Sequence, residues 1–89
     1  MMKTLIIENQ FRKDLKSIRK RGTDLSKLET LIPLLQNDEP IPPRHRPHKL
    51  AGEWKGVWEC HVLPDLLLIY DFDAETLSLI RLGSHADLF

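Results

Sequence analysis

The sequence has a single cysteine, Cys60, and no apolar segment long enough to cross a bilayer. One thiol excludes an internal disulfide, and a chain without disulfides suits a reducing compartment. The apolar run near the N-terminus is only Leu5-Ile6-Ile7, too short for a secretion signal or a membrane span. The formal net charge is zero, because thirteen basic residues balance thirteen acidic ones. We therefore expect a cytoplasmic protein without a membrane partner, and the total charge does not indicate nucleic-acid binding.

The 89 residues suffice for one domain, which we place over residues 1–89. Hydrophobic residues make up 42% and charged residues 29%, as in ordinary globular proteins. The charges are unevenly distributed: residues 12–21 carry six Lys or Arg against one acid, Asp14, and residues 44–49 read RHRPHK. This asymmetry is compatible with an anionic partner on one face, although a basic helix face is more often only solvated.

The first half of the chain shows a strand pattern followed by two helix patterns. Residues 3–8 are rich in β-branched side chains and predict a short strand. From Asn9 a helix follows, and Gly22 stands where a left-handed residue ends a helix. Its apolar stripe consists of Phe11, Leu15 and Ile18.

Thr23 or Asp24 is a suitable cap for the second helix. Pro33 lies within this helix, where it removes one hydrogen bond and clashes with the carbonyl of Glu29. We therefore expect a kink or a late restart at Pro33. The predicted apolar stripe consists of Leu25, Leu28, Ile32 and Leu35.

The second half predicts a proline-stiffened loop over residues 37–52 and then three strands, over residues 54–62, 66–72 and 76–82. In the last strand, side chains of one face alternate with those of the other, as Leu77, Leu79 and Arg81 against Ser78, Ile80 and Leu82. The connections are short, so neighbouring strands pair antiparallel. The fold class is α+β: a short N-terminal strand, a two-helix hairpin, then a three-stranded meander with the helices on one sheet face.

Histidines are the residues with the clearest potential for chemistry. In an up-and-down meander, the end of the first of these three strands, the start of the second and the end of the third lie at one rim of the sheet. His61, Asp65 and His85 occupy these places, and the preceding loop can bring His48 close. We expect His45 to lie exposed in that loop, and Ser84 to cap one helical turn at the C-terminus.

Imidazoles and a carboxylate at one rim suit acid–base cleavage of RNA. The 2′-hydroxyl attacks the adjacent phosphate when one group removes its proton and another protonates the departing 5′-oxygen. Imidazole, with a reference pKa of about 6.5, can do either near neutral pH. Asp65 can orient a histidine or act as the base, and Arg81 can balance charge on the phosphorane.

Each residue also has a purely structural interpretation. Asp65 after Pro64 is a common turn pair, and His61 can be a surface residue of a strand. A metal site is the weaker choice, because the only close histidine pair, His45 and His48, lies in a proline-rich loop and no Cys-x-x-Cys or His-Glu-x-x-His spacing occurs. Core or rim packing is the more common role of the aromatic side chains, which are Trp54, Trp58, Tyr70 and Phe72.

From His48 onward the sequence resembles the YafQ family of the RelE superfamily. The shared pattern has a histidine before an L-x-G-x-W-K element, then H-x-x-P-D, a strand ending in L-I-Y, and a closing R-x-G-[ST]-H-x-x-L-F. This chain carries HKLAGEWKG over 48–56, HVLPD over 61–65, LIY over 68–70 and RLGSHADLF over 81–89. The motifs stand in order with matching spacing over half the chain, and the N-terminal half agrees in layout.

The resemblance implies a RelE-like fold and a toxin of a type II toxin–antitoxin pair, an endoribonuclease that cuts mRNA in the ribosomal A site. It assigns catalysis to His48, His61, Asp65 and His85, with no cofactor and no metal. The residues expected to contact the substrate or its phosphates are Arg81, Phe89, Lys49 and Lys55. The implied partners are mRNA on the ribosome, ribosomal RNA held by basic side chains of the first helix, and a small antitoxin. Operator DNA would be bound only through the antitoxin complex.

Three other hypotheses stay open on the sequence. The chain can be a binding module that contacts antitoxin and DNA without cutting. It can be a ribonuclease that needs no ribosome. It can also be a metal-dependent nuclease with ligands drawn from His45, His48, His61 and Asp65.

Overall fold

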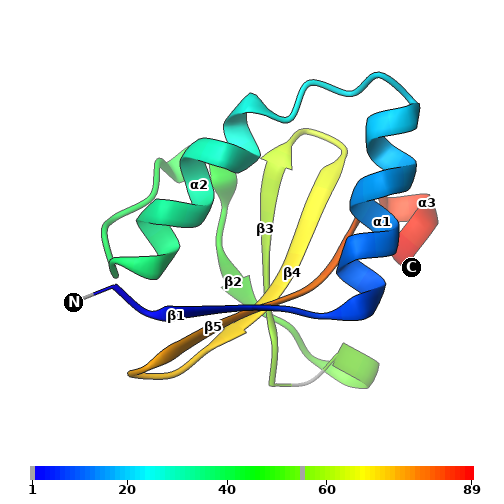
Figure 1. Cartoon of the computed structure of the whole chain (residues 1–89). Coiled ribbons are helices and arrows are strands. Elements are labelled where there is room, and N and C mark those ends of the chain that lie inside the picture. Colours follow the sequence, from blue (N-terminus) through cyan, green and yellow to red (C-terminus); the bar gives the residue numbers. More distant parts are fainter. Residues whose placement is uncertain (1, 55) are drawn as a thin grey trace.

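The computed structural model describes residues 2–54 and 56–89. A five-stranded sheet carries two long helices on one face, as Figure 1 shows. The strands are β1 (Thr4–Ile7), β2 (His48–Lys49), β3 (Trp58–Leu63), β4 (Leu66–Phe72) and β5 (Thr76–Gly83). The α-helices are α1 (Asn9–Lys20), α2 (Ser26–Gln36) and the short α3 (His85–Leu88), and single 3-10 turns cover Pro43–His45 and Gly52–Trp54. The predicted α+β class, with helices on one sheet face, is confirmed.

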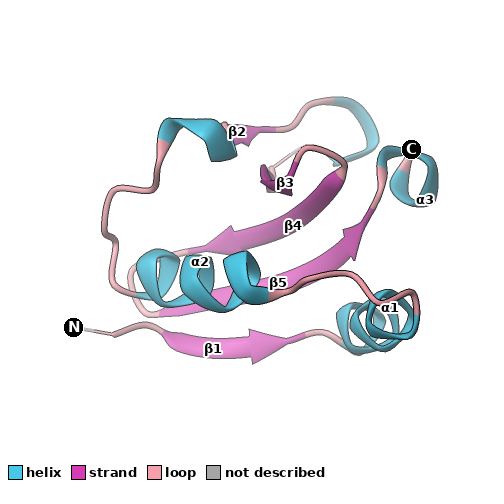
Figure 2. Cartoon of the chain, turned by 90° about the horizontal axis from the view of Figure 1, so that it is seen from above, coloured by secondary structure: helices cyan, strands magenta, loops and turns pink. Residues whose placement is uncertain are grey.

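The sheet order is β1-β5-β4-β3-β2, and Figure 2 shows the strands side by side in this order. The meander β3–β4–β5 is antiparallel, as predicted, whereas β1 lies parallel to β5, with Thr4 paired with Thr76. Residues 37–52 are not only loop: His48 and Lys49 form β2, which pairs with β3 at the sheet edge. The sequence predicted four strands, and the structure has a fifth, β2. A strand of two residues is too short to show a hydrophobic alternation in the sequence.

Two predicted strand details were wrong. The strand expected from residue 54 begins at Trp58, since Gly52–Trp54 forms a 3-10 turn. In β5 the alternation fails after Leu79, because a bulge pairs Tyr70 with Leu79 but Ile69 with Arg81. The bulge returns Leu82 to the helix-covered core and leaves Arg81 on the other side of the strand.

The helices follow the predicted stripes. Phe11 and Ile18 of α1 are buried, and Gly22 has the left-handed φ of +78° that ends this helix. In α2 the buried residues are Leu28, as predicted, and Leu31, which the predicted stripe left out. The predicted stripe residues Leu25, Ile32 and Leu35 pack around them.

Helix α2 runs through Pro33 without a restart. The ring faces solvent, so the carbonyl that loses its helical partner can bind water instead. The predicted cap at Thr23 or Asp24 was wrong, because Leu25 is the N-cap of this helix and no side chain caps it. Asp24 instead accepts a hydrogen bond from the Ser26 amide at 2.9 Å just before the helix.

Each sheet face has its own apolar cluster. The larger one lies under α1 and α2 and contains Cys60, Val62 and Tyr70. The smaller one, on the opposite face, joins Leu67 and Ile69 to the segment around Trp54 and to Leu88 of α3. Within the described residues, no helix is long and apolar enough to cross a membrane.

Candidate functional site

Three of the predicted site residues meet at one rim of the sheet. His61 lies near the end of β3, Asp65 in the tight turn to β4, and His85 at the start of α3 after β5. The rings of His61 and His85 are 5.8 Å apart between centroids, and His85 Nδ1 is 2.8 Å from Asp65 Oδ1. The prediction that His61, Asp65 and His85 lie together at one rim is therefore confirmed.

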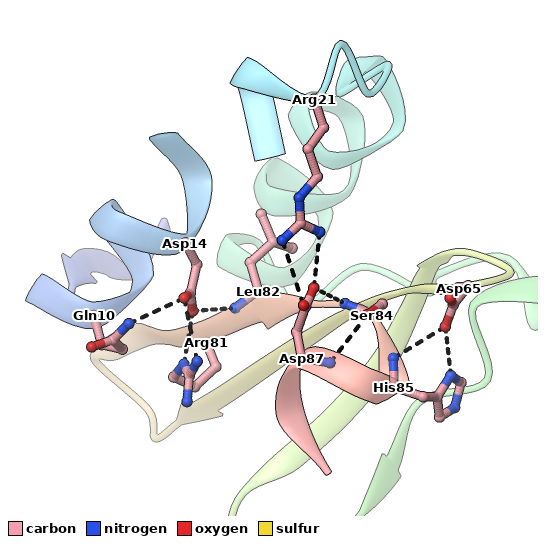
Figure 3. A network of polar contacts seen from close by, with 9 residues as sticks. All are labelled: Gln10, Asp14, Arg21, Asp65, Arg81, Leu82, Ser84, His85 and Asp87. Atoms are coloured by element: carbon pink, nitrogen blue, oxygen red, sulfur yellow. Dashed lines mark hydrogen bonds and ion pairs between the residues drawn. The ribbon is translucent and has the colours of Figure 1, made fainter. Parts of the chain in front are cut away.

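Asp65 fixes the orientation of His85. One oxygen of its carboxylate, Oδ1, accepts hydrogen bonds from the His85 amide at 3.1 Å and from the ring Nδ1 at 2.8 Å, both drawn in Figure 3. These bonds hold the pKa of Asp65 below its ordinary value, so the group is ionised near neutral pH. Because a carboxylate only accepts, Nδ1 carries the proton and Nε2 is left free at an exposed position.

A buried carboxylate, Glu59, joins two further histidines. Its Oε1 lies 3.4 Å from His48 Nε2 and 3.9 Å from His61 Nε2, and the residue is only 5% exposed. His48 and Glu59 are paired across β2 and β3, and His48 Nδ1 also bonds the Arg46 carbonyl at 3.0 Å. Sequence reasoning overlooked Glu59, although its position two residues before His61 in a strand places both side chains on one face.

His45 does not lie exposed in the loop, as expected, but is buried. It is 5% exposed, and its Nδ1 is 2.6 Å from the carbonyl oxygen of His61. The 3-10 turn Pro43–His45 packs against β3 and turns this side chain inward. The burial follows from a long-range hydrogen bond that ties the loop to β3, which loop composition does not reveal.

Arg81 is held by α1 (Figure 3). Its Nε donates to Asp14 Oδ2 at 2.7 Å, and the same oxygen accepts from the Leu82 amide at 3.0 Å. Burial opposes ionisation of Asp14, yet the bonds from Arg81 and Leu82 lower its pKa overall. Asp14 is the single acid within the basic stretch of α1, and the structure gives it a partner near the opposite end of the chain.

The short helix α3 is anchored at both sides of His85. Ser84 caps it: the Asp87 amide donates to Ser84 Oγ at 3.1 Å, and the Ser84 amide donates to Asp87 Oδ2 at 2.9 Å. The predicted cap at Ser84 is confirmed. Arg21, just after α1, donates to Asp87 Oδ2 at 3.0 Å. That bond, first among several, lowers the pKa of Asp87 to about 2.

The other expected substrate contacts are placed differently. Phe89 is 60% exposed, and its ring stands edge-on to that of Trp54, which packs against the smaller apolar cluster; the two ring centroids are 6.1 Å apart. Lys49 is paired with Trp58, so strand alternation places it on the opposite side of β2 from His48. Lys55 lies outside the described residues.

Among residues 2–54 and 56–89, no group of three or more His, Cys, Asp or Glu side chains is arranged to hold a metal ion. The histidines of the site instead each contact a carboxylate: His85 contacts Asp65, and both His48 and His61 contact Glu59. Such pairs can take up and release protons, with each carboxylate fixing a ring.

Known proteins share the sequence and the fold of this chain. The family model for the bacterial toxin YafQ of type II toxin–antitoxin systems matches residues 3–89. The mRNA interferase toxin YafQ of Escherichia coli K12 is 43% identical over 81 residues, covering 90% of this chain and 88% of the relative.

Two solved structures superpose closely on this fold. A copper-bound variant toxin from Helicobacter pylori has a TM-score of 0.92 and 40% identity, over 100% of both chains. The E. coli DinJ–YafQ toxin–antitoxin complex has a TM-score of 0.91 and 39% identity, over 100% of this chain and 99% of the other. The chain thus belongs to the YafQ family, the bacterial toxins of type II toxin–antitoxin systems.

Proposed function

We propose that this protein is an mRNA interferase that cuts mRNA on the ribosome by metal-independent acid–base catalysis. The observation that carries the proposal is the meeting of His85, Asp65 and His61 at one exposed rim. The E. coli relative is named an mRNA interferase, which supports the same activity here. Dependence on the ribosome rests on the family resemblance.

The reaction needs two proton carriers on either side of a phosphodiester. One removes the proton of the 2′-hydroxyl, whose oxygen then forms a bond to phosphorus. The P–O5′ bond breaks, and the second carrier protonates the departing 5′-oxygen, leaving a 2′,3′-cyclic phosphate and a 5′-hydroxyl. Rings about 6 Å apart, as those of His61 and His85 are, can both contact one phosphate group.

The carboxylates position these rings. Asp65 leaves His85 Nε2 free to exchange a proton with the substrate, and Glu59 contacts His48 and His61 from within the sheet. We assign Glu59 as a positioning residue, because at 5% exposure it is shielded from RNA. Arg81 and Phe89 stay our proposed contacts to the phosphate and the substrate, with Arg81 steered by Asp14.

The test compares the wild-type chain with His85→Ala, with Glu75→Ala in the exposed β4–β5 connection as the matched control. Each is expressed in bacteria, and new mRNA 5′-hydroxyl ends are mapped on a reporter with its start codon intact or destroyed. We expect cuts only in the translated message, retained by Glu75→Ala and lost in His85→Ala. Cuts in both reporters would identify a ribosome-independent ribonuclease, and an absence of His85-dependent cuts would favour a binding module.

We also propose a cognate antitoxin as the protein partner, with operator DNA bound only through that complex. The support is the E. coli DinJ–YafQ complex, whose toxin matches this fold over its full length. Co-expression with the antitoxin gene should relieve toxicity and give a complex that co-purifies. Unrelieved growth arrest would contradict this partner.

A further inference from the structure

We infer that the groove beside His61, lined by Lys27, Arg44 and Arg46, binds the phosphates of the RNA strand that flank the cleaved bond. This inference rests on the proposed function, and it names a binding surface that the motif residues do not include. The groove has a volume of about 400 Å³, and its lining includes His61 itself. A strand that enters the groove therefore reaches the candidate catalytic rim without leaving the surface.

The three cations of this groove are available to a ligand. Lys27, Arg44 and Arg46 are all exposed, and within the described part of the chain none lies within 4.0 Å of a carboxylate. Arg81 differs, since Asp14 already occupies its guanidinium. The groove thus offers positive charge that needs no carboxylate to be displaced first.

The backbone under these cations is fixed relative to His61. His45 lies between Arg44 and Arg46, and its ring bonds the His61 carbonyl at 2.6 Å. Pro43 and Pro47 flank the segment, and Arg46 has a left-handed φ of 47°, a conformation rare for a residue with a side chain. Local backbone strain of this kind persists where the surroundings enforce it, often at binding sites.

The negative charge at the rim is a second reason to expect a cationic groove beside it. Asp65 places an exposed, ionised carboxylate beside the histidines, so it opposes the approach of a phosphodiester. Cations alongside His61 offset this repulsion and hold the strand in register with the imidazoles. Because His61 is among the residues that line the groove, a nucleic-acid strand is a better occupant than a segment of protein.

The test measures RNA binding apart from cleavage. In a His85→Ala background, the three groove cations are changed to glutamine (Lys27→Gln, Arg44→Gln, Arg46→Gln). The matched control removes equal charge from α1 (Lys13→Gln, Lys16→Gln, Lys20→Gln) and serves only in the binding assay, because basic side chains of α1 are the expected ribosomal RNA contacts. Affinity for a 2′-O-methylated single-stranded RNA 12-mer is followed by fluorescence anisotropy across a series of salt concentrations. The three groove changes alone, in the chain with His85 intact, are assayed for cuts in translated message.

Each lost phosphate contact lowers affinity roughly fivefold at 0.1 M salt and reduces the slope of log K against log salt by about 0.7. We expect the groove variant to lose affinity for RNA on the order of 100-fold, its slope of log K against log salt to fall by about 2, and its cutting to weaken. The α1 control should show smaller changes in affinity and in slope. Equal losses in both variants, or no binding by the His85→Ala parent, would overturn the inference. A groove variant that binds RNA with normal affinity but no longer binds the antitoxin would also overturn the inference. Normal cutting by the groove variant would overturn the groove alone, whereas a wild-type chain that never cuts would remove the proposed function.

Discussion

Replacing Gly83 with alanine should move the helix that carries His85. A Cβ atom at this position would stand 2.9 Å from Asp87 Cβ and 3.3 Å from Leu88 Cδ2. Carbon atoms pack at about 3.5–4.0 Å, so α3 has to shift by roughly 0.6–1 Å to admit the methyl group. Overpacking of this kind costs about 1–3 kcal/mol of folding free energy. A displacement near 1 Å can reduce a rate by about 10²-fold.

The assay has two readouts: thermal unfolding and the cutting of translated message at a temperature where every variant is folded. A loss of about 2 kcal/mol lowers Tm by roughly 10 °C in a domain of this size. The matched control is Gly22→Ala, where no atom lies within 4 Å but φ is +78°. Its left-handed conformation costs alanine about 1–2 kcal/mol, so stability falls similarly without any change at the rim.

We expect Gly83→Ala to lose cutting activity and Gly22→Ala to keep it, although both unfold at lower temperature. If Gly83→Ala unfolds early yet cuts at the wild-type rate, the position of α3 does not control the reaction. Equal loss of activity in both variants would mean that reduced stability alone explains the effect.

Three further predictions address the charges and the thiol. Asp65→Asn should keep the fold but lower cutting by about 10²-fold, because the carboxylate that fixes the His85 tautomer is gone; an unchanged pH–rate profile would contradict this. The low pKa of Asp87 stabilises the fold above about pH 4, and this contribution is lost as pH falls towards 2. Chemical unfolding should therefore show Asp87→Asn less stable by about 1 kcal/mol at pH 7, after allowance for solvent screening, and equal to wild type near pH 2. Burial raises the pKa of Cys60 to about 12, so a thiol reagent should react with it only after unfolding.

Topology let the rim be predicted from the sequence. His61, Asp65 and His85 were placed together because short connections force an up-and-down meander, which fixes where strand ends lie. Apolar stripes likewise predicted the buried faces of α1 and α2. Such features depend on local spacing, which a single sequence shows directly.

Features that depend on distant partners were not predictable in this way. Asp14 bonds Arg81, and Arg21 bonds Asp87, across most of the length of the chain. The inward turn of His45 likewise needs the carbonyl of a strand that forms elsewhere. Glu59 was also missed, but it could have been predicted. It lies two residues before His61 in a strand, and this spacing places both side chains on one face of the sheet.

The order of the strands also bears on how the protein is made. Of the five described strands β1 is synthesised before the others, yet it pairs among them only with β5, which is synthesised after the other four. Pairing between segments so far apart in sequence is slow, and it cannot begin until nearly the whole chain exists. His85 follows β5, so the candidate catalytic rim is completed only after the five described strands have been translated. We expect nascent chains to be harmless to the ribosome that makes them, with cutting activity arising only on release.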